Sequence, residues 1–346
     1  MDGASRPIAV LVDREGLGDV MLKTPFLRAL RRAFPDHPVW WIANHQSSMA
    51  DELRPMFAGE VAKVITQAGI DGAAGPMLRR LAEFPPFERV FDSRTKVSTV
   101  ALARLGLKHR GFYCCLPGYI LCDGAAPFLH QRPRHIAQRM LSLIPRATGR
   151  AADSSGRLEA SAASQSEAMR LLPEGATYVG IAPGSRQANK NWPFERFCEV
   201  ARALTGQGLT PVFLLGPMER QSPTDIEAAA PGALTFRADA APPEQRGAGL
   251  DLLIAQGQRL SLLLANDNGV GHLLGAAGVP VVSLFGPMRP ERWAPVAPDN
   301  LILDSRAFGG GDDVAAIPVQ AVIEGVKTLL ARRPSTASRS PSPSLR

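Results

Sequence analysis

Two loops of the sequence combine glycine, hydroxyl and cationic residues in a way that suits phosphate binding. Residues 183–191 read PGSRQANKN, and residues 267–272 read DNGVGH. Backbone N–H groups at the start of a helix, together with a hydroxyl and two cations, can hold a diphosphate. Each loop alone is equally consistent with a solvated turn, or with a capping Asp or Asn beside a histidine at the core edge. Adjacent parallel strands would bring both loops to one ligand, which favours the phosphate interpretation.

An acid in the first half of the chain, Asp19, suits a different chemistry. It follows Gly16 and Gly18, which permit a tight turn close to a ligand, and it lies where a helix is predicted to begin. Such a carboxylate can act as general base on an acceptor hydroxyl, or it can simply cap the helix. The turn is not a dinucleotide fingerprint, because Met21 occupies the place of the third glycine.

Other chemistries find less support. Glu219, which follows a strand ending in Gly216-Pro217, can accept hydrogen bonds from a ribose but is equally typical of an ordinary surface glutamate. The sequence has no Asp-x-Asp at a strand end, no H-E-x-x-H and no G-x-S-x-G elbow, so we predict neither a metal site nor a serine nucleophile. The four cysteines lack a paired C-x-x-C spacing, and we expect reduced thiols.

Alternating strands and helices must position these residues. Short apolar runs predict buried parallel strands, and amphipathic stretches predict the helices between them. The predicted strands are 8–12, 38–43, 61–65 and 89–92 in the first half, and 178–182, 211–215, 260–265 and 279–285 in the second. The predicted helices follow residue 19, with a kink or a later start at Pro25, and cover 138–144, 193–204 and 269–277.

This alternation predicts two α/β domains, each with a parallel sheet. Residues 151–165 are small and polar, as in a linker, and a chain of 346 residues exceeds one ordinary core. We therefore predict Rossmann-like domains at 1–155 and 166–332, facing each other across a cleft. The Ser/Pro/Arg-rich segment 333–346 is predicted to be a disordered tail.

The charge of the chain favours an acidic partner. The formal net charge is +7 and the pI is about 9.6, which suits an anionic lipid, a phosphorylated glycan or nucleic acid, or basicity without a role. No RNA-binding or helix-turn-helix signature is present, so we discount nucleic acid. No apolar run is long enough to span a membrane and the N-terminus lacks a secretory signal, so we expect a cytoplasmic protein.

With these motifs in order, the chain resembles glycosyltransferase family 9, the ADP-heptose:lipopolysaccharide heptosyltransferases. The resemblance runs from Ile8 to about Pro298. It rests on the Gly-Asp turn within 12–20, the segments 90–111 and 135–141, the two phosphate loops, and the strand PVVSLFGP at 280–287. It implies a GT-B fold and a metal-independent, inverting transfer of a heptose or related sugar from an ADP-sugar to lipopolysaccharide or another glycan, without a cofactor.

The resemblance also implies roles for the site residues. The N-terminal domain would bind the acceptor, with Asp19 as catalytic base, and the C-terminal domain would bind the nucleotide sugar. Lys96, Arg110 and His135 would meet an acidic or lipid-linked acceptor, with the protein a monomer at the inner face of the cytoplasmic membrane. The expected donor-binding residues are Ser185, Arg186, Lys190, Glu219, Asp267, Asn268, Gly269 and His272.

Three features depart from the family pattern. Asn268 stands where the family has Ser or Thr, the turn 13–16 is more charged than the usual Ser-rich turn, and Met140 replaces an aromatic residue. They suggest a divergent member whose acceptor differs from the inner-core heptose acceptors. Two alternatives stay open: a sugar-nucleotide epimerase or hydrolase of the same fold, and a catalytically silent nucleotide-sugar-binding protein.

Overall fold

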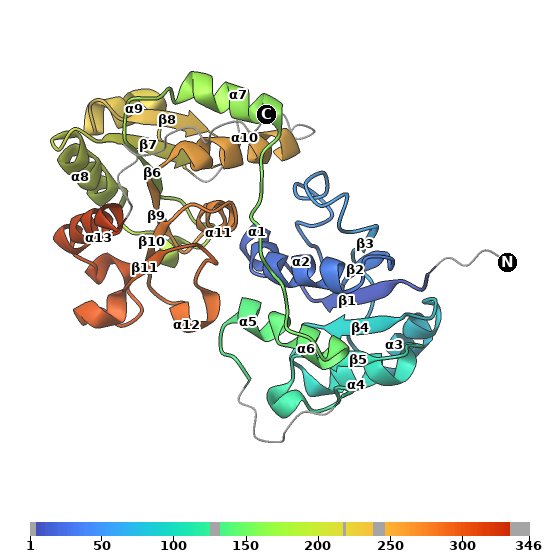
Figure 1. The fold of residues 1–346 in the computed structure, drawn as a ribbon. Helices are drawn as coiled ribbons and strands as arrows, with labels where there is room; N and C mark the ends of the chain where they lie inside the picture. Colours follow the sequence, from blue (N-terminus) through green and yellow to red (C-terminus); the bar gives the residue numbers. More distant parts are fainter. Residues whose placement is uncertain (1–4, 125–131, 217–218, 238–245, 333–346) are drawn as a thin grey trace.

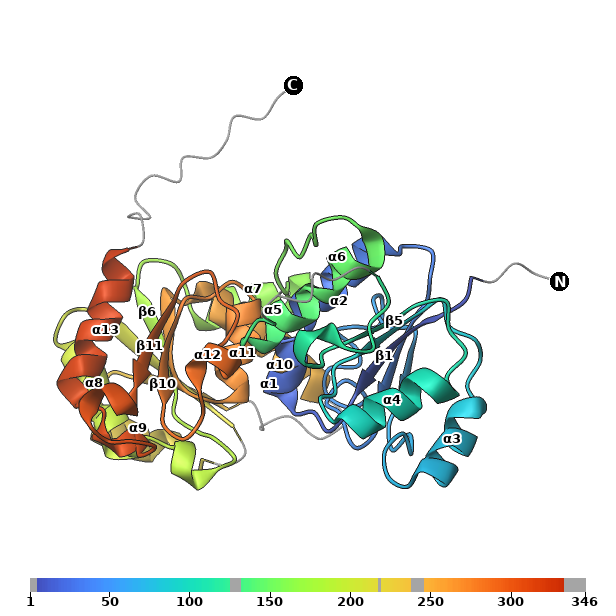
Figure 2. The ribbon, with the colours of Figure 1, turned by 90° about the horizontal axis from the view of Figure 1, so that it is seen from below.

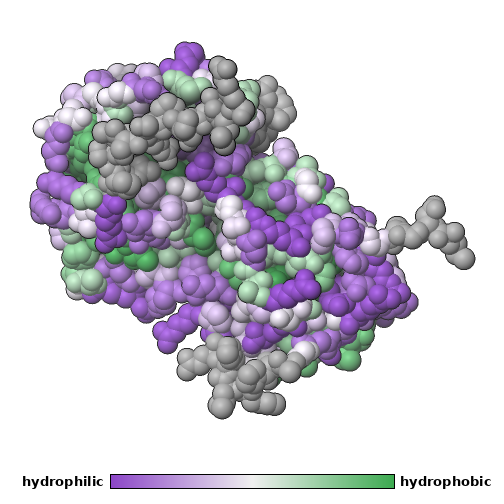
Figure 3. All heavy atoms as spheres, in the orientation of Figure 1, coloured by the Kyte–Doolittle hydropathy of each residue, from purple (hydrophilic) through white to green (hydrophobic). Residues whose placement is uncertain are grey.

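The chain folds into two α/β lobes, each built on its own parallel sheet (Figure 1). The computed structural model describes residues 5–124, 132–216, 219–237 and 246–332. The segment 333–346, which the sequence predicts to be a disordered tail, lies outside the described residues. Hydrophilic residues cover much of the visible face of both lobes (Figure 3).

The N-terminal lobe has a five-stranded sheet in the order β3-β2-β1-β4-β5. Both faces of this sheet are buried: Val10 packs toward α2, whereas Leu11 packs toward α3 and α4. This two-sided burial explains the unbroken apolar run of the first strand. The strands are β1 (Ile8–Val12), β2 (Val39–Ala43), β3 (Lys63–Ile65), β4 (Arg89–Asp92) and β5 (Phe112–Cys114). The helices are α1 (Leu17–Met21), α2 (Thr24–Ala33), α3 (Ala74–Ala82), α4 (Val97–Gly106), η1 (Pro117–Tyr119), α5 (Ile136–Leu141) and α6 (Leu143–Thr148).

The C-terminal lobe has a six-stranded parallel sheet in the order β11-β10-β9-β6-β7-β8. Its central strand alternates in the same way, since Ile181 packs with α8 and α13 and Ala182 with α10 and α11. The strands are β6 (Tyr178–Ala182), β7 (Thr210–Leu215), β8 (Leu234–Arg237), β9 (Leu262–Asn266), β10 (Val281–Phe285) and β11 (Asn300–Asp304). The helices are α7 (Ala162–Leu171), η2 (Ala188–Lys190), α8 (Phe194–Thr205), α9 (Pro223–Ala229), α10 (Arg246–Arg259), α11 (Gly269–Ala276), α12 (Pro290–Trp293), η4 (Ser305–Phe308), η5 (Val314–Ala316) and α13 (Val319–Ala331).

The two lobes meet where α1 packs against α11 (Figure 2). The approach is close, because a Cβ placed on Gly269 would lie 2.9 Å from the Leu17 side chain. The chain crosses from one lobe to the other between α6 and α7, and on the way the Leu158 N–H donates to the Ala276 carbonyl over 2.9 Å. One apolar cluster therefore runs through the inner faces of both lobes.

The predicted elements agree with the structure where the hydrophobic pattern is strong. The break expected at Pro25 is confirmed, since α1 ends at Met21 and α2 begins at Thr24 with Pro25 in its first turn. The single helix predicted at 138–144 is wrong: α5 and α6 meet at Ser142. Strands β5, β8 and β11 were not predicted. All three lie at sheet edges, and β8 and β11 are only partly buried, so they lack the continuous apolar run of the central strands.

Candidate functional site at the seam of the two lobes

The site lies at the carboxyl ends of the central strands. In each sheet the chain reverses its order beside the first strand, between β1 and β4 and between β6 and β9. Loops that follow such strands meet at a crevice where α/β proteins bind ligands. Here the loops after all four strands, at 13–16, 93–96, 183–193 and 267–268, face the seam between the lobes.

The two loops of the C-terminal lobe are brought together as predicted, through Asp267. The Lys190 ammonium donates to Asp267 Oδ2 over 2.7 Å, and His272 Nε2 lies 3.8 Å from Oδ1. The Ser185 hydroxyl approaches the Asp267 carbonyl at 3.5 Å. Burial alone would raise the pKa of the Asp267 carboxyl, but hydrogen bonds from His272 and Lys190 outweigh it and hold that pKa below its ordinary value. The carboxylate thus contacts side chains of both loops, Lys190 and His272.

Two asparagines fix the path of the first loop. Asn268 caps α11, accepting from the Gly271 N–H at 2.8 Å, while its amide donates to the carbonyls of Ala182 and Gly184 at 2.9 and 2.7 Å. Asn266, to which the sequence analysis gave no role and which is the last residue of β9, accepts from the Trp192 N–H at 3.2 Å and donates to the Pro183 carbonyl. In this structure both the amide nitrogen and the amide oxygen of Asn268 bond to protein backbone.

Glu219 lies against the same loop. Its Oε2 accepts from the Gly216 N–H at 3.0 Å, and a Cβ on Gly184 would fall 1.5 Å from its Oε1, so a side chain at 184 would displace the Glu219 carboxylate. A cavity of about 390 Å³ opens beside this contact. Its lining includes Gly184, Ser185, Arg186, Asn191, Trp192, Phe194, Glu219 and Gln221. A hydroxyl, a guanidinium and an aromatic floor suit the phosphate and nucleoside parts of a nucleotide.

Asp19 comes to the same seam from the N-terminal lobe. It is the third residue of α1, not its cap: Gly16 occupies the cap position and its N–H donates to Asp19 Oδ2 over 3.0 Å. The prediction of a simple capping aspartate is therefore wrong in detail. A Cβ on Gly18 would lie 2.8 Å from the His272 ring, and one on Gly16 would lie 3.9 Å from Arg186 Nη1. Asp19 thus lies next to the two loops of the other lobe, residues 183–191 and 267–272.

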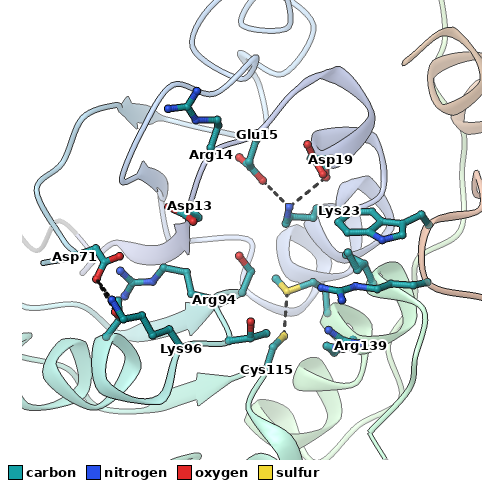
Figure 4. Close-up of a pocket in the computed structure, with 17 residues that line it drawn as sticks. Asp13, Arg14, Glu15, Asp19, Lys23, Asp71, Arg94, Lys96, Cys115 and Arg139 are labelled. Atoms are coloured by element: carbon teal, nitrogen blue, oxygen red, sulfur yellow. Dashed lines mark hydrogen bonds and ion pairs between the residues drawn. The ribbon is translucent and has the colours of Figure 1, made fainter. Parts of the chain in front are cut away.

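A second cavity, of about 310 Å³, lies below Asp19 (Figure 4). Helix α12 of the C-terminal lobe contributes to its wall, so the cavity belongs to both lobes. Its charged lining residues are Asp13, Arg14, Glu15, Asp19, Lys23, Asp71, Arg94, Lys96, Arg139 and Arg292. Ser93, Thr95, Thr99, Cys115, Ile136, Met140 and Trp293 complete it. The surroundings suit a polar, charged molecule with hydroxyl groups.

The floor beside Asp19 is built on a buried ion pair that sequence reasoning missed. Lys23 Nζ lies 2.6 Å from Glu15 Oε1 and 3.2 Å from the Asp19 carbonyl. Glu15 Oε2 accepts from Trp41 Nε1 at 2.8 Å and from the Ser47 hydroxyl at 2.9 Å. Burial would lower the Lys23 pKa, but Glu15 and Asp19 outweigh it and raise that pKa above its ordinary value. The turn that carries Asp19 is therefore stabilised by this ion pair as well as by backbone hydrogen bonds.

The family model for glycosyltransferase family 9 (heptosyltransferase) matches residues 87–311, more than half of the chain. The chain belongs to glycosyltransferase family 9. A comparison of the sequence with curated proteins found no significant match.

Solved structures with the same fold cover most of this chain. A family 9 glycosyltransferase from Veillonella parvula is 21% identical, covers 96% of this chain and 99% of its own, and has a TM-score of 0.67. The Escherichia coli ADP-heptose lps heptosyltransferase II is 17% identical, with 93% and 98% covered and a TM-score of 0.61. The E. coli heptosyltransferase WaaC with ADP is 16% identical, with 93% and 99% covered and a TM-score of 0.60. The predicted GT-B fold, two facing Rossmann-like domains, is confirmed.

The three predicted acceptor residues of this glycosyltransferase lie in different places. Lys96 lines the cavity and pairs with Asp71 over 3.3 Å. Arg110 precedes β5 and so lies at the opposite edge of the sheet, where it pairs with Glu88 over 3.1 Å; the structure does not bring it to the site. His135 Nε2 forms a hydrogen bond with the Ala294 carbonyl of the C-terminal lobe at 2.9 Å, so it links the two lobes beside the cavity.

Neither a metal-binding cluster nor a disulfide is found among the residues that the structure describes. Within those residues, no group of three or more His, Cys, Asp or Glu side chains is arranged to hold a metal ion. The four cysteines are free, with Cys114 and Cys122 placing their sulfurs 3.5 Å apart. Among the described helices, none combines the length and apolar composition needed to cross a bilayer.

Proposed function

We propose that this glycosyltransferase moves a heptose, or a related sugar, from an ADP-sugar to lipopolysaccharide or another glycan, with inversion at the anomeric carbon and without a metal. Support for the donor comes from the related structures, which include an ADP-heptose lps heptosyltransferase and WaaC with ADP. Support for the acceptor comes from the charged cavity that faces the donor loops. A lipid-linked acceptor would bring the enzyme to a membrane surface.

The position of Asp19 carries this proposal. Its carboxylate lines the N-terminal cavity, while its neighbour Gly18 packs on the His272 ring of the donor loops. An acceptor hydroxyl in the cavity would give its proton to Asp19 as its oxygen attacks the anomeric carbon. The bond from that carbon to the diphosphate breaks on the opposite face, and ADP leaves with the electron pair.

The negative charge of the leaving diphosphate needs compensation from the C-terminal lobe. Lys190 is held at the site by Asp267, and Arg186 lies exposed at the seam near Gly16. The N-terminus of α11 adds free backbone N–H groups at the same place. Two cations and a helix N-terminus pre-arranged around the leaving group are an established way to stabilise developing charge.

The test is Asp19→Asn, which keeps an oxygen that can accept from the Gly16 N–H but removes the base. We expect turnover to fall by about 10²- to 10⁴-fold while ADP affinity, measured by calorimetry, is unchanged. Asp36→Asn, an exposed carboxylate of the same lobe, is the matched control and should retain activity. Retained transfer by Asp19→Asn would exclude Asp19 as the base.

The donor is tested separately with a thermal-shift panel of ADP-, UDP-, GDP- and CMP-sugars. Stabilisation by ADP-heptose above the others supports the proposal, since a ligand that binds only the folded state raises the melting temperature. Incubation of the stabilising donor without any acceptor then distinguishes transfer from hydrolysis or epimerisation. Rapid consumption of donor alone would contradict transfer as the main reaction.

A further inference from the structure

Two cysteines that line neither cavity lie side by side in the N-terminal lobe. Cys114 ends β5 and is fully buried, whereas Cys122 follows η1 and is partly exposed. Their sulfurs are 3.5 Å apart, the Cys114 N–H donates to Cys122 Sγ over 3.0 Å, and the Cys122 thiol lies 3.2 Å from the Cys114 carbonyl. A disulfide bond is about 2.0 Å long, so the two sulfurs need to approach by only about 1.5 Å to form one.

The chain between the two cysteines turns back on β5 and holds them opposite each other. The Asp123 N–H donates to the Phe112 carbonyl, and the Phe112 N–H donates to Asp123 Oδ2, each over 2.7 Å. The turn uses left-handed backbone at Tyr119 (φ 54°) and Leu121 (φ 68°), a conformation that residues other than glycine rarely adopt. Backbone of this kind persists where the surrounding contacts hold it, and here it keeps the two sulfurs together.

The surroundings of Cys122 favour ionisation of its thiol over that of Cys114. A hydrogen bond from the Cys114 thiol, a second from the Cys114 N–H, and the charges of Arg146 and Arg104 outweigh burial and lower the Cys122 pKa. The same thiol hydrogen bond, together with burial, raises the pKa of Cys114. Arg104 is paired with Asp123 over 2.5 Å, whereas Arg146 has no carboxylate partner among the described residues. Reactive cysteines occur in such partly exposed, electropositive surroundings.

We propose that Cys122 and Cys114 are a redox-modification site that forms a reversible disulfide when the protein meets hydrogen peroxide. The Cys122 thiolate attacks one peroxide oxygen and the O–O bond breaks, which leaves Cys122 as a sulfenic acid and releases hydroxide. The hydroxide takes up the proton that Cys122 gave up and becomes water. The Cys114 sulfur then attacks Cys122 Sγ, the S–O bond breaks, and the hydroxyl group leaves as a second water with the Cys114 proton. Two thiols are thus oxidised and one peroxide is reduced.

The other two cysteines provide internal controls. Cys115 lines the N-terminal cavity (Figure 4), but its sulfur is buried against Met140 Sδ at 3.5 Å, and burial raises its pKa to about 12. Cys198 is buried in the other lobe, and burial raises its pKa as well. We therefore expect neither to compete with Cys122 for the oxidant, since the thiolate is the reacting form.

The experiment treats the reduced protein with hydrogen peroxide and follows intact mass and non-reducing peptide maps. We expect a mass lower by two hydrogens, a cross-link through residue 122, and full recovery after dithiothreitol. Cys114→Ser keeps a hydroxyl that can donate to the Ile120 carbonyl, as the thiol does at 3.1 Å. This variant should gain oxygen at Cys122 and lose no hydrogens, because its sulfenic acid has no partner thiol. Cys122→Ser should lose thiols about tenfold more slowly than the unmodified protein, because its remaining thiols are buried.

Cys115→Ala and Cys198→Ala are the matched controls, and both should form the disulfide as readily as the unmodified protein. Cys115→Ala also identifies the partner, because Cys114 and Cys115 are adjacent and share one peptide. Oxygen addition without a cross-link in the unmodified protein, or a cross-link that persists in Cys114→Ser, would overturn the proposal. The unmodified protein and Cys115→Ala decide the question even where a serine variant fails to fold. No readout involves donor or acceptor, so the result is independent of the proposed function.

Discussion

A buried lysine–carboxylate pair lies beside the site in each lobe, and the two pairs differ in how fully they are bonded. In the N-terminal lobe, both oxygens of Glu15 have partners, and Lys23 uses two of its three N–H donors. In the C-terminal lobe, Lys190 donates to Asp267 alone among the described residues. The side chain of Glu15 is 1% exposed, whereas that of Lys190 is 14% exposed.

This difference bears on the role of each pair. Both carboxylate oxygens of Glu15 are bonded within the protein, so the pair fixes the turn before Asp19. Lys190 donates to Asp267 alone among the described residues, so its ammonium, which has three donors, can also bind a phosphate oxygen without breaking a protein bond. A lysine–carboxylate pair is therefore fully bonded within the N-terminal lobe, whereas the pair of the C-terminal lobe leaves donors that the proposed diphosphate can use.

The largest effect is expected from a substitution that breaks the Lys23–Glu15 pair of the N-terminal lobe. Glu15→Gln leaves the Lys23 ammonium buried without a counter-charge, and removal of one member of a buried pair costs about 3–5 kcal/mol. We expect a loss of that order in the free energy of unfolding, measured by urea denaturation. The double variant Glu15→Met with Lys23→Met should recover most of it, since a well-packed apolar pair avoids the desolvation penalty. If Glu15→Gln left the free energy of unfolding unchanged, this would show that water reaches the Lys23 ammonium.

The second largest effect is expected from a substitution that breaks the Lys190–Asp267 pair of the C-terminal lobe. Lys190→Ala should weaken ADP by about 10- to 100-fold, the range for a hydrogen bond to a charged group, and should destabilise the empty protein less than Glu15→Gln. His272 Nε2 stays 3.8 Å from Asp267 Oδ1 in this variant, so the carboxylate keeps a polar partner. Calorimetric titration with ADP measures the first quantity. Lys327→Ala, an exposed lysine on α13, is the control and should bind ADP normally.

The comparison also shows which parts of the site sequence reasoning can reach. The donor loops were predictable because each follows a strongly apolar strand, and carboxyl ends of parallel strands share one edge. Asp19 was found for the same reason. The pairing of Lys190 with Asp267 is not visible in the sequence, since 77 residues separate them, but the shared edge made their meeting expected.

The rest of the site depends on contacts that no local pattern encodes. Arg110 was assigned to the acceptor from the family resemblance and its charge. Strand β5, which was not predicted, begins just after it and places it at the amino edge of the sheet, away from the site. Arg292 and Trp293 reach the N-terminal cavity only through the packing of one lobe on the other. Glu15 was noted as an unusual charge in the turn, but its partner Trp41 lies on the next strand.

The smallest expected effect concerns the tie between the lobes and its dependence on pH. Burial lowers the His135 pKa, and the neighbouring His272 and Arg139 lower it further, while the bond to the Ala294 carbonyl opposes them. Since Nε2–H donates to that carbonyl and Nδ1 is buried without a described partner, the folded protein favours the neutral ring. The unfolded chain binds a proton more readily, so stability falls as the pH drops through about 6.5, the ordinary histidine value.

Melting temperatures between pH 7.5 and 5.5 measure this dependence. His135→Gln provides the comparison, because its amide can donate to the Ala294 carbonyl at every pH without titrating. We expect the unmodified protein to lose more stability on acidification than His135→Gln, by a margin smaller than either lysine-pair variant produces. Parallel slopes for the two proteins would show that His135 is protonated equally in the folded and unfolded states, and that the tie between the lobes does not depend on its charge.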